Sequence, residues 1–192
     1  MTSAEEVGRI LTTESEVDRR LLYFGALLAR EITNAGSGLI IVGGSAIEVY
    51  TRGRYVSGDI DIVGPKKQLG EVLEEWGFRN EGRLWHRADW GIAVDVVSSE
   101  YTGDLARTRQ ITTPFGPIRI AAIEDLLVKR LASAKHWRIP ADVEQALLLA
   151  LGYPDEIDWS YVEVRAKEYH VSDLLSDLRR RMGSKAPRST ES

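Results

Sequence analysis

The sequence contains no cysteine and only three histidines among its 192 residues. The absence of cysteine excludes disulfide scaffolds, thiolate metal sites and cysteine nucleophiles, and it fits a reducing compartment. No apolar run reaches the roughly 18 residues that a bilayer span needs. Residues 1–10 also lack the cationic and apolar segments of a signal peptide. We therefore expect a cytoplasmic protein that does not enter a membrane.

The charge balance is weakly acidic, with 25 basic and 29 acidic side chains and a net charge of −4. Proteins that coat nucleic acid nonspecifically are usually basic, because the release of counterions drives that binding. This class of function is therefore disfavoured, although a local basic patch for a tRNA or a nucleotide stays open. Hydrophobic residues make up 43% of the chain, which is ordinary for a globular protein with a real core.

The apolar pattern predicts an α+β fold, in which a small mixed sheet is flanked by helices. Strands or hairpins are expected at 38–42, 59–63, 83–88, 91–97 and 111–120. Helices are expected at 13–34, 45–53, 67–76, 123–137, 141–151, 159–169 and 172–182. The predicted organisation is a core at 1–121, a helical C-terminal subdomain at 122–183 and a flexible tail at 184–192.

Two aspartates, Asp59 and Asp61, alternate with apolar residues in the segment DIDIV. In a strand they project from one face, about 6–7 Å apart, and a shared divalent cation relieves their repulsion. Asp95 stands in a second apolar segment, GIAVDVV, and joins them if the two strands pair. A cluster of three carboxylates, without cysteine and with isolated histidines, favours Mg²⁺ or Mn²⁺ over zinc.

A turn that can bind phosphate precedes these carboxylates. The apolar run before it ends in Gly43, Gly44 and Ser45, which lead directly into a predicted helix. The glycines let the backbone approach a triphosphate, the serine offers a hydroxyl, and the helix N-terminus favours negative charge. Each motif alone is weak, but the turn, the Asp-X-Asp pair and the later aspartate form a more specific pattern in this order.

These residues resemble the polymerase-β-like nucleotidyltransferase superfamily, whose signature is a Gly-Gly or Gly-Ser turn, a strand with Asp-X-Asp and a third carboxylate. The chain looks most like the small single-chain members, the AbiEii-type toxins and the lincosamide or aminoglycoside nucleotidyltransferases. The segment EDLLVKRLASAKHW is similar to a helix of AbiEii-type proteins, with Arg130 where those usually have lysine.

The resemblance implies transfer of an NMP group from an NTP to an acceptor hydroxyl, with release of pyrophosphate. The acceptor would be a tRNA, a protein or a small molecule, and a cognate antitoxin or other partner protein is a further implication. Asp59, Asp61 and Asp95 would hold two Mg²⁺ or Mn²⁺ ions, and Asp95 could take the acceptor proton. Gly43, Gly44 and Ser45 would bind the nucleotide.

Two basic side chains of the predicted helix 123–137 are further candidates for nucleotide binding. Arg130 falls inside the apolar arc of this helix, where it either snorkels to water or points at a phosphate. Lys135 leaves that arc, and it is either a solvated charge or a substrate contact. Both residues are predicted here as nucleotide-binding.

Two other interpretations compete with an enzyme. One is a catalytically degenerate nucleotidyltransferase that serves as an antitoxin-like or regulatory binding module. The other is a purely structural protein, in which Asp59 and Asp61 face solvent and Asp95 pairs with an arginine. Because all three carboxylates are present, we favour the enzyme.

Overall fold

The structure is a computed structural model that describes residues 2–32 and 38–185. The chain divides into two compact units, Met1–Ala122 and Ile123–Ser192. The predicted helix end at Asn34 and Gly36 lies outside the described residues. So does most of the predicted tail, namely residues 186–192.

The first unit contains four α-helices, seven strands and two short 3₁₀ helices among the residues described. The helices are α1 (Ala4–Thr13), α2 (Val17–Ile32), α3 (Gly43–Tyr50), α4 (Lys66–Glu75), η2 (Ala88–Trp90) and η3 (Leu105–Arg107). The strands are β1 (Ile40–Ile41), β2 (Ile60–Val63), β3 (Arg79–Glu81), β4 (Leu84–Arg87), β5 (Ile92–Ser98), β6 (Arg109–Thr113) and β7 (Gly116–Ile120).

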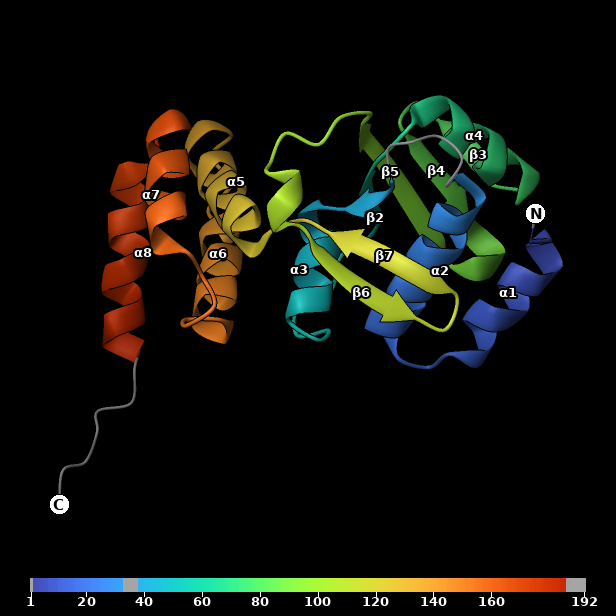
Figure 1. The fold of residues 1–192 in the computed structure, drawn as a ribbon, viewed down its shortest axis with the longest axis horizontal. Helices are drawn as coiled ribbons and strands as arrows, with labels where there is room; N and C mark the ends of the chain where they lie inside the picture. Colours follow the sequence, from blue (N-terminus) through green and yellow to red (C-terminus); the bar gives the residue numbers. More distant parts are fainter. Residues whose placement is uncertain (1, 33–37, 186–192) are drawn as a thin grey trace, which may run out of the picture. The chain divides into compact units, whose positions relative to one another are not determined.

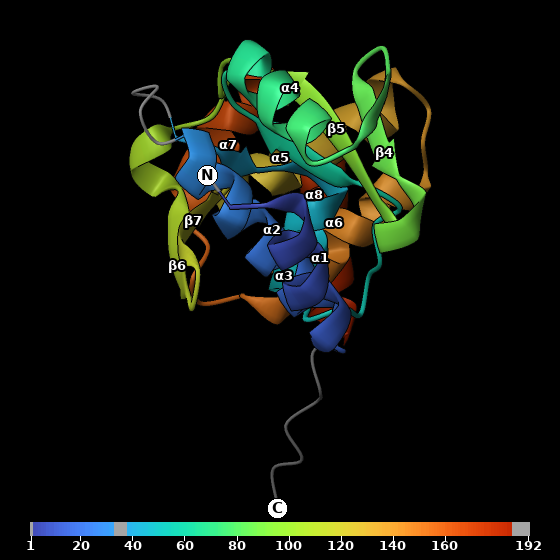
Figure 2. The same ribbon diagram turned by 90° about the vertical axis from the view of Figure 1, so that its right-hand side faces the viewer.

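The prediction of one helix from Thr13 to Asn34 is wrong at its beginning. The structure has a separate helix α1, which ends at Thr13, and α2 begins only at Val17. The side chain of Ser3 caps α1 by accepting a hydrogen bond from the N–H of Glu6. At the other end Glu14 has extended backbone angles, so the chain leaves the helix there. Figure 2 shows α1 lying against α2.

The strands form one mixed sheet in the order β3-β4-β5-β2-β1-β7-β6 (Figure 1). β2 runs parallel to β5 and antiparallel to β1, and β1 runs parallel to β7. The two predicted hairpins, β4–β5 and β6–β7, are antiparallel pairs. The predicted α+β class with a mixed sheet is therefore confirmed.

Apolar residues on one face of the central strands pack toward α2. Ile60 and Ile62 of β2 are buried, and so are Val94 and Val96 of β5. Helix α2 comes close to the sheet at Gly25, where a Cβ atom would lie 3.1 Å from Cδ1 of Ile41. Because side chains alternate along a strand, this packing directs the intervening aspartates of β2 and β5 to the opposite face.

All the regular secondary structure in the described residues of the second unit is helical. It consists of α5 (Ile123–His136), α6 (Ala141–Gly152), α7 (Trp159–Glu168) and α8 (Ser172–Lys185), close to the four predicted ranges. Its core is formed by apolar side chains such as Leu127, Leu131, Leu149, Val162 and Leu178. Across residues 2–32 and 38–185, no helix combines the length and the apolar character that crossing a bilayer requires.

Candidate active site

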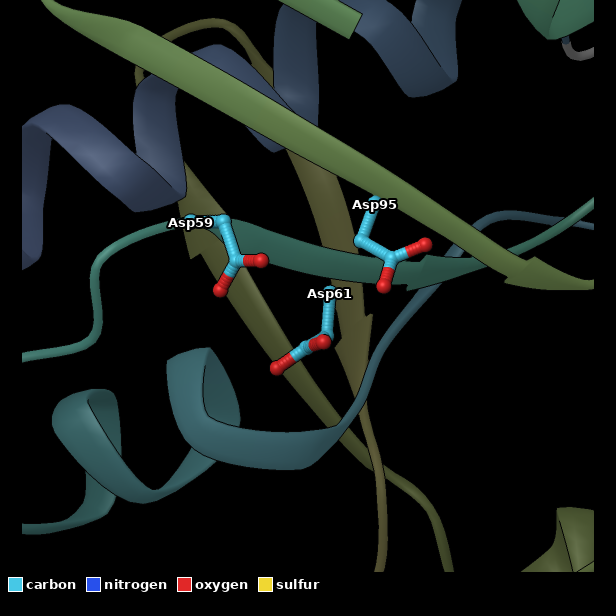
Figure 3. Close-up of side chains that lie close together, drawn as sticks. All are labelled: Asp59, Asp61 and Asp95. Carbon is cyan, nitrogen blue, oxygen red and sulfur yellow. The ribbon is translucent and has the colours of Figure 1, made fainter. Parts of the chain in front are cut away.

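Asp59, Asp61 and Asp95 meet on one face of the sheet. The parallel register of β2 and β5 places Asp61 directly opposite Asp95. One carboxylate oxygen from each of the three residues lies within 4.8 Å of the other two. Figure 3 shows the three side chains gathered on the same side of the two strands. The predicted meeting of Asp95 with the Asp-X-Asp pair is thus confirmed, and we call these residues the aspartate triad.

The beginning of α3 fixes the position of Asp61. The N–H of Gly44 donates a 2.7 Å hydrogen bond to Oδ2 of Asp61. The hydroxyl of Ser45 is fully buried, accepts a hydrogen bond from the N–H of Asp61 at 3.0 Å, and donates one to the carbonyl of Val42 at 2.9 Å. In this structure the turn therefore holds the strand that carries Asp61. A contact from Gly43, Gly44 or Ser45 to a nucleotide stays a prediction.

Gly43 permits the close approach of Asp61 to this turn. Its φ of +57° lies in the left-handed region that side chains other than hydrogen disfavour. A Cβ atom at this position would lie 2.3 Å from Oδ2 of Asp61, which is far inside van der Waals contact. Both the backbone conformation and the neighbouring carboxylate therefore require glycine here.

Asp95 is the most enclosed member of the triad, with 6% of its surface exposed. Its Oδ2 lies 3.2 Å from Nε of Arg83, whose side chain is 72% exposed. Its Oδ1 is buried and has no hydrogen-bond partner in the described part of the chain. Burial raises the pKa of Asp95, Arg83 opposes this rise, and the charge of Asp59 adds to it. The arginine partner considered from the sequence thus exists, but it satisfies only one oxygen.

The raised pKa of Asp95 has a measurable consequence for stability. The ordinary pKa of an aspartate is 3.8, and that of Asp95 in the folded protein is higher. Between these two pKa values the folded state keeps the Asp95 proton while the unfolded state has released it. The unfolding free energy of the metal-free wild type should therefore fall as the pH rises through this window. The variant Asp95→Asn has no titrating carboxyl group at this position. The unfolding free energy of the variant minus that of the wild type should therefore increase across the window and stay constant above it. Urea unfolding of both proteins in EDTA at several pH values measures the difference. Parallel pH profiles would contradict the raised pKa.

The aspartate triad fits a hard divalent cation. Mg²⁺ and Mn²⁺ prefer carboxylate oxygens, and three such oxygens converge here without a sulfur or histidine ligand in the cluster. The buried Oδ1 of Asp95 is an unpaired acceptor, which a bound cation would satisfy. The three carboxylates and the unpaired oxygen of Asp95 therefore both favour a bound divalent cation.

Arg130 and Lys135 lie on α5, in the second unit, where each has a local partner. Nη1 of Arg130 is 3.5 Å from Oδ1 of the buried Asp142. Nζ of Lys135 donates 2.7 Å hydrogen bonds to the carbonyl of His170 and to Oδ1 of Asp173. Both side chains therefore have a structural role within the helical unit. Nucleotide binding by them stays a prediction.

Two residues near the triad were not singled out from the sequence. Arg83, in the turn directly before β4, contacts Asp95, and this link depends on strand pairing that is not visible in the sequence. Glu48 is a buried acidic residue of α3. It stands among apolar neighbours in AIEVY, so the pattern that marked Asp95 could also have marked Glu48.

Comparison with known proteins supports the fold. No family model matches the sequence, and a search of curated protein sequences gives no match either. The fold is similar to the solution structure of the antibiotic-resistance factor ANT(2'')-Ia, with a TM-score of 0.56 and 16% sequence identity. The similarity covers 85% of this chain and 97% of that one. This likeness shows that the two chains share a fold, and it agrees with the α+β nucleotidyltransferase-like fold expected from the sequence.

Proposed function

We propose that this chain is a metal-dependent nucleotidyltransferase that transfers an NMP group from an NTP to a hydroxyl of a tRNA, a protein or a small molecule. The observation that carries the proposal is the aspartate triad, with its oxygens within 4.8 Å of one another. The fixed position of Asp61 at the beginning of α3 adds support, because catalysis of this kind depends on positioning. The nucleotidyltransferase fold supports the same reaction.

In the proposed reaction the acceptor oxygen forms a bond to the α-phosphorus of the NTP. The bond from that phosphorus to the oxygen bridging the β-phosphate breaks, and pyrophosphate leaves with the electron pair. Asp95 is a suitable base for the acceptor proton, because burial raises its pKa and therefore its affinity for a proton. Two bound Mg²⁺ or Mn²⁺ ions, held by the triad, would neutralise charge on the attacking and leaving oxygens.

Thermal unfolding with ATP, GTP, CTP and UTP, each with and without Mg²⁺, tests this proposal and identifies the donor. A ligand that binds only the folded state at 100 times its Kd adds about 2.7 kcal/mol to the unfolding free energy. For a chain of this size the expected rise in Tm is roughly 5–10 °C. We expect this shift for at least one NTP, and only when Mg²⁺ is present.

Asp59→Asn is the matched control for this experiment, since it changes one ligand oxygen to nitrogen at nearly constant volume. The Mg²⁺-dependent shift should disappear in this variant. Pyrophosphate release with the stabilising NTP then tests turnover. A wild-type protein that shows no shift with any NTP would contradict the proposal and would favour the binding-module interpretation.

A further inference from the structure

Asp59 is held differently from the other two members of the triad. β2 begins at Ile60, and its pairing with β5 begins with Ile60 opposite Val94. Asp61 and Asp95 therefore lie within paired strands, whereas Asp59 lies just before the strand. Its position depends on the segment 57–59, the last part of the connection from α3 to β2.

Packing constrains this segment only in part. Ser57, Gly58 and Asp59 border a pocket of about 90 Å³, which also adjoins residues of α2 and the beginning of β5. A Cβ atom built on Gly58 would meet no heavy atom within 4 Å. Because dense packing is what usually fixes a backbone, this segment needs another restraint.

Glu48 supplies a specific contact to the segment. Its Oε2 accepts a 2.7 Å hydrogen bond from the N–H of Ser57, and the hydroxyl of Ser57 donates a long 3.4 Å bond to Oδ1 of Asp59. Glu48 is only 2% exposed, and its Oε1 has no hydrogen-bond partner in the part of the chain described. Burial raises the pKa of Glu48. A carboxyl group in such surroundings is costly, so its presence needs a compensating role.

Helix α3 thus contacts Asp61 directly and, through Glu48, the segment that precedes Asp59. Gly44, in its first turn, donates to the carboxylate of Asp61. Glu48 stands four residues later, on the same face of the helix, and accepts from the segment that carries Asp59. The two hydrogen bonds therefore restrain Asp61, and the segment before Asp59, against the same helix.

We propose that Glu48 is a positioning residue, which fixes the segment 57–59 and thereby orients Asp59 toward the cation that the triad holds. This inference rests on the proposed function, because it assigns Glu48 a part in the same metal site. Its hydrogen bond to Ser57, and not its negative charge, performs this role. The variant Glu48→Gln, which keeps an acceptor oxygen, should therefore behave like the wild type.

Mn²⁺ titration of the full chain, followed by electron paramagnetic resonance, tests the role of Glu48. Residues that orient metal ligands typically change affinity by about 10–100-fold when they are replaced. We expect Glu48→Ala to bind Mn²⁺ at least about tenfold more weakly than wild type, and Glu48→Gln to stay within about threefold. In pyrophosphate release, Glu48→Ala should raise the Mg²⁺ concentration for half-maximal rate more than it lowers kcat at saturating Mg²⁺.

Glu124→Ala is a matched control for lost stability. Glu124 is a buried glutamate of α5, with 7% of its surface exposed, and its Oε1 accepts a 3.1 Å hydrogen bond from the N–H of Asp158. Each alanine variant removes a buried carboxyl group and, with it, the acceptor of one hydrogen bond from a loop N–H. Glu124→Ala should nevertheless leave the Mn²⁺ affinity unchanged. Melting curves show whether the two variants are destabilised to a similar degree.

Three results would overturn the role of Glu48. It is wrong if Glu48→Ala binds Mn²⁺ as tightly as wild type, if Glu48→Gln loses as much affinity as Glu48→Ala, or if Glu124→Ala loses as much. In these cases wild-type Mn²⁺ binding and turnover would still support the proposed function. A wild-type protein that binds no Mn²⁺ would overturn the proposed function, and the role of Glu48 with it.

Discussion

Asp61→Asn should lower the rate of pyrophosphate release from the donor NTP by about a thousandfold or more. Asparagine keeps the size of the side chain and an acceptor for the N–H of Gly44, but it removes one negative ligand from the triad. Charge stabilisation by a bound metal contributes several kcal/mol, and each 1.36 kcal/mol corresponds to a factor of ten in rate. Single-turnover pyrophosphate release at saturating Mg²⁺ and NTP measures the loss.

The control for Asp61→Asn is Asp125→Asn, which changes a buried aspartate of α5 outside the triad. Asp125 accepts a 3.0 Å hydrogen bond from the hydroxyl of Tyr161. Its replacement should lower the melting temperature without removing transfer activity. If Asp61→Asn keeps both turnover and Mg²⁺-dependent stabilisation, the triad is not the active site.

Gly43→Ala should weaken metal binding and remove most of the activity, even though it adds only a methyl group. The new Cβ would lie 2.3 Å from Oδ2 of Asp61, so the carboxylate or the turn must move. A left-handed backbone conformation at a non-glycine residue costs a further 1–2 kcal/mol or so. We expect Mn²⁺ affinity to fall by at least about tenfold and the melting temperature to fall by several degrees.

Gly82→Ala separates the two effects of the Gly43 substitution. Gly82 has a φ of +74°, but a Cβ atom there would meet nothing within 4 Å. This variant should therefore lose stability through backbone strain alone and keep its Mn²⁺ affinity. Equal loss of Mn²⁺ affinity in both variants would show that the contact with Asp61 is unimportant.

The sequence predicts the convergence of the aspartate triad better than it predicts the contacts that support the triad. Asp59, Asp61 and Asp95 stand out because each is a charged residue in an otherwise apolar segment of the sequence. This pattern can be recognised without knowing how the strands pair. Strand β3 (Arg79–Glu81) carries no such signal, because all its residues are exposed and it lacks apolar alternation. Its place in the sheet comes from pairing with β4, which is a tertiary contact.

The supports of the site depend on contacts between distant segments. Ser45 bonds to Asp61 across 16 positions, and Arg83 reaches Asp95 only because β4 and β5 form a hairpin. Helix α1 was missed for a different reason. Its polar and acidic residues hide an amphipathic pattern, in which Val7 and Leu11 are fully buried while neighbouring side chains stay exposed.

The strand order places β2 in the middle of the sheet, as the fourth of seven strands. The hairpins β3–β4 and β6–β7 lie at opposite margins, and their turns can take up insertions more readily than a central strand can. Sequence change at the margins can therefore alter the ends of the sheet while the aspartate triad stays in place at its centre. Such an architecture separates the parts of the sheet that tolerate sequence change from the strand that carries Asp61.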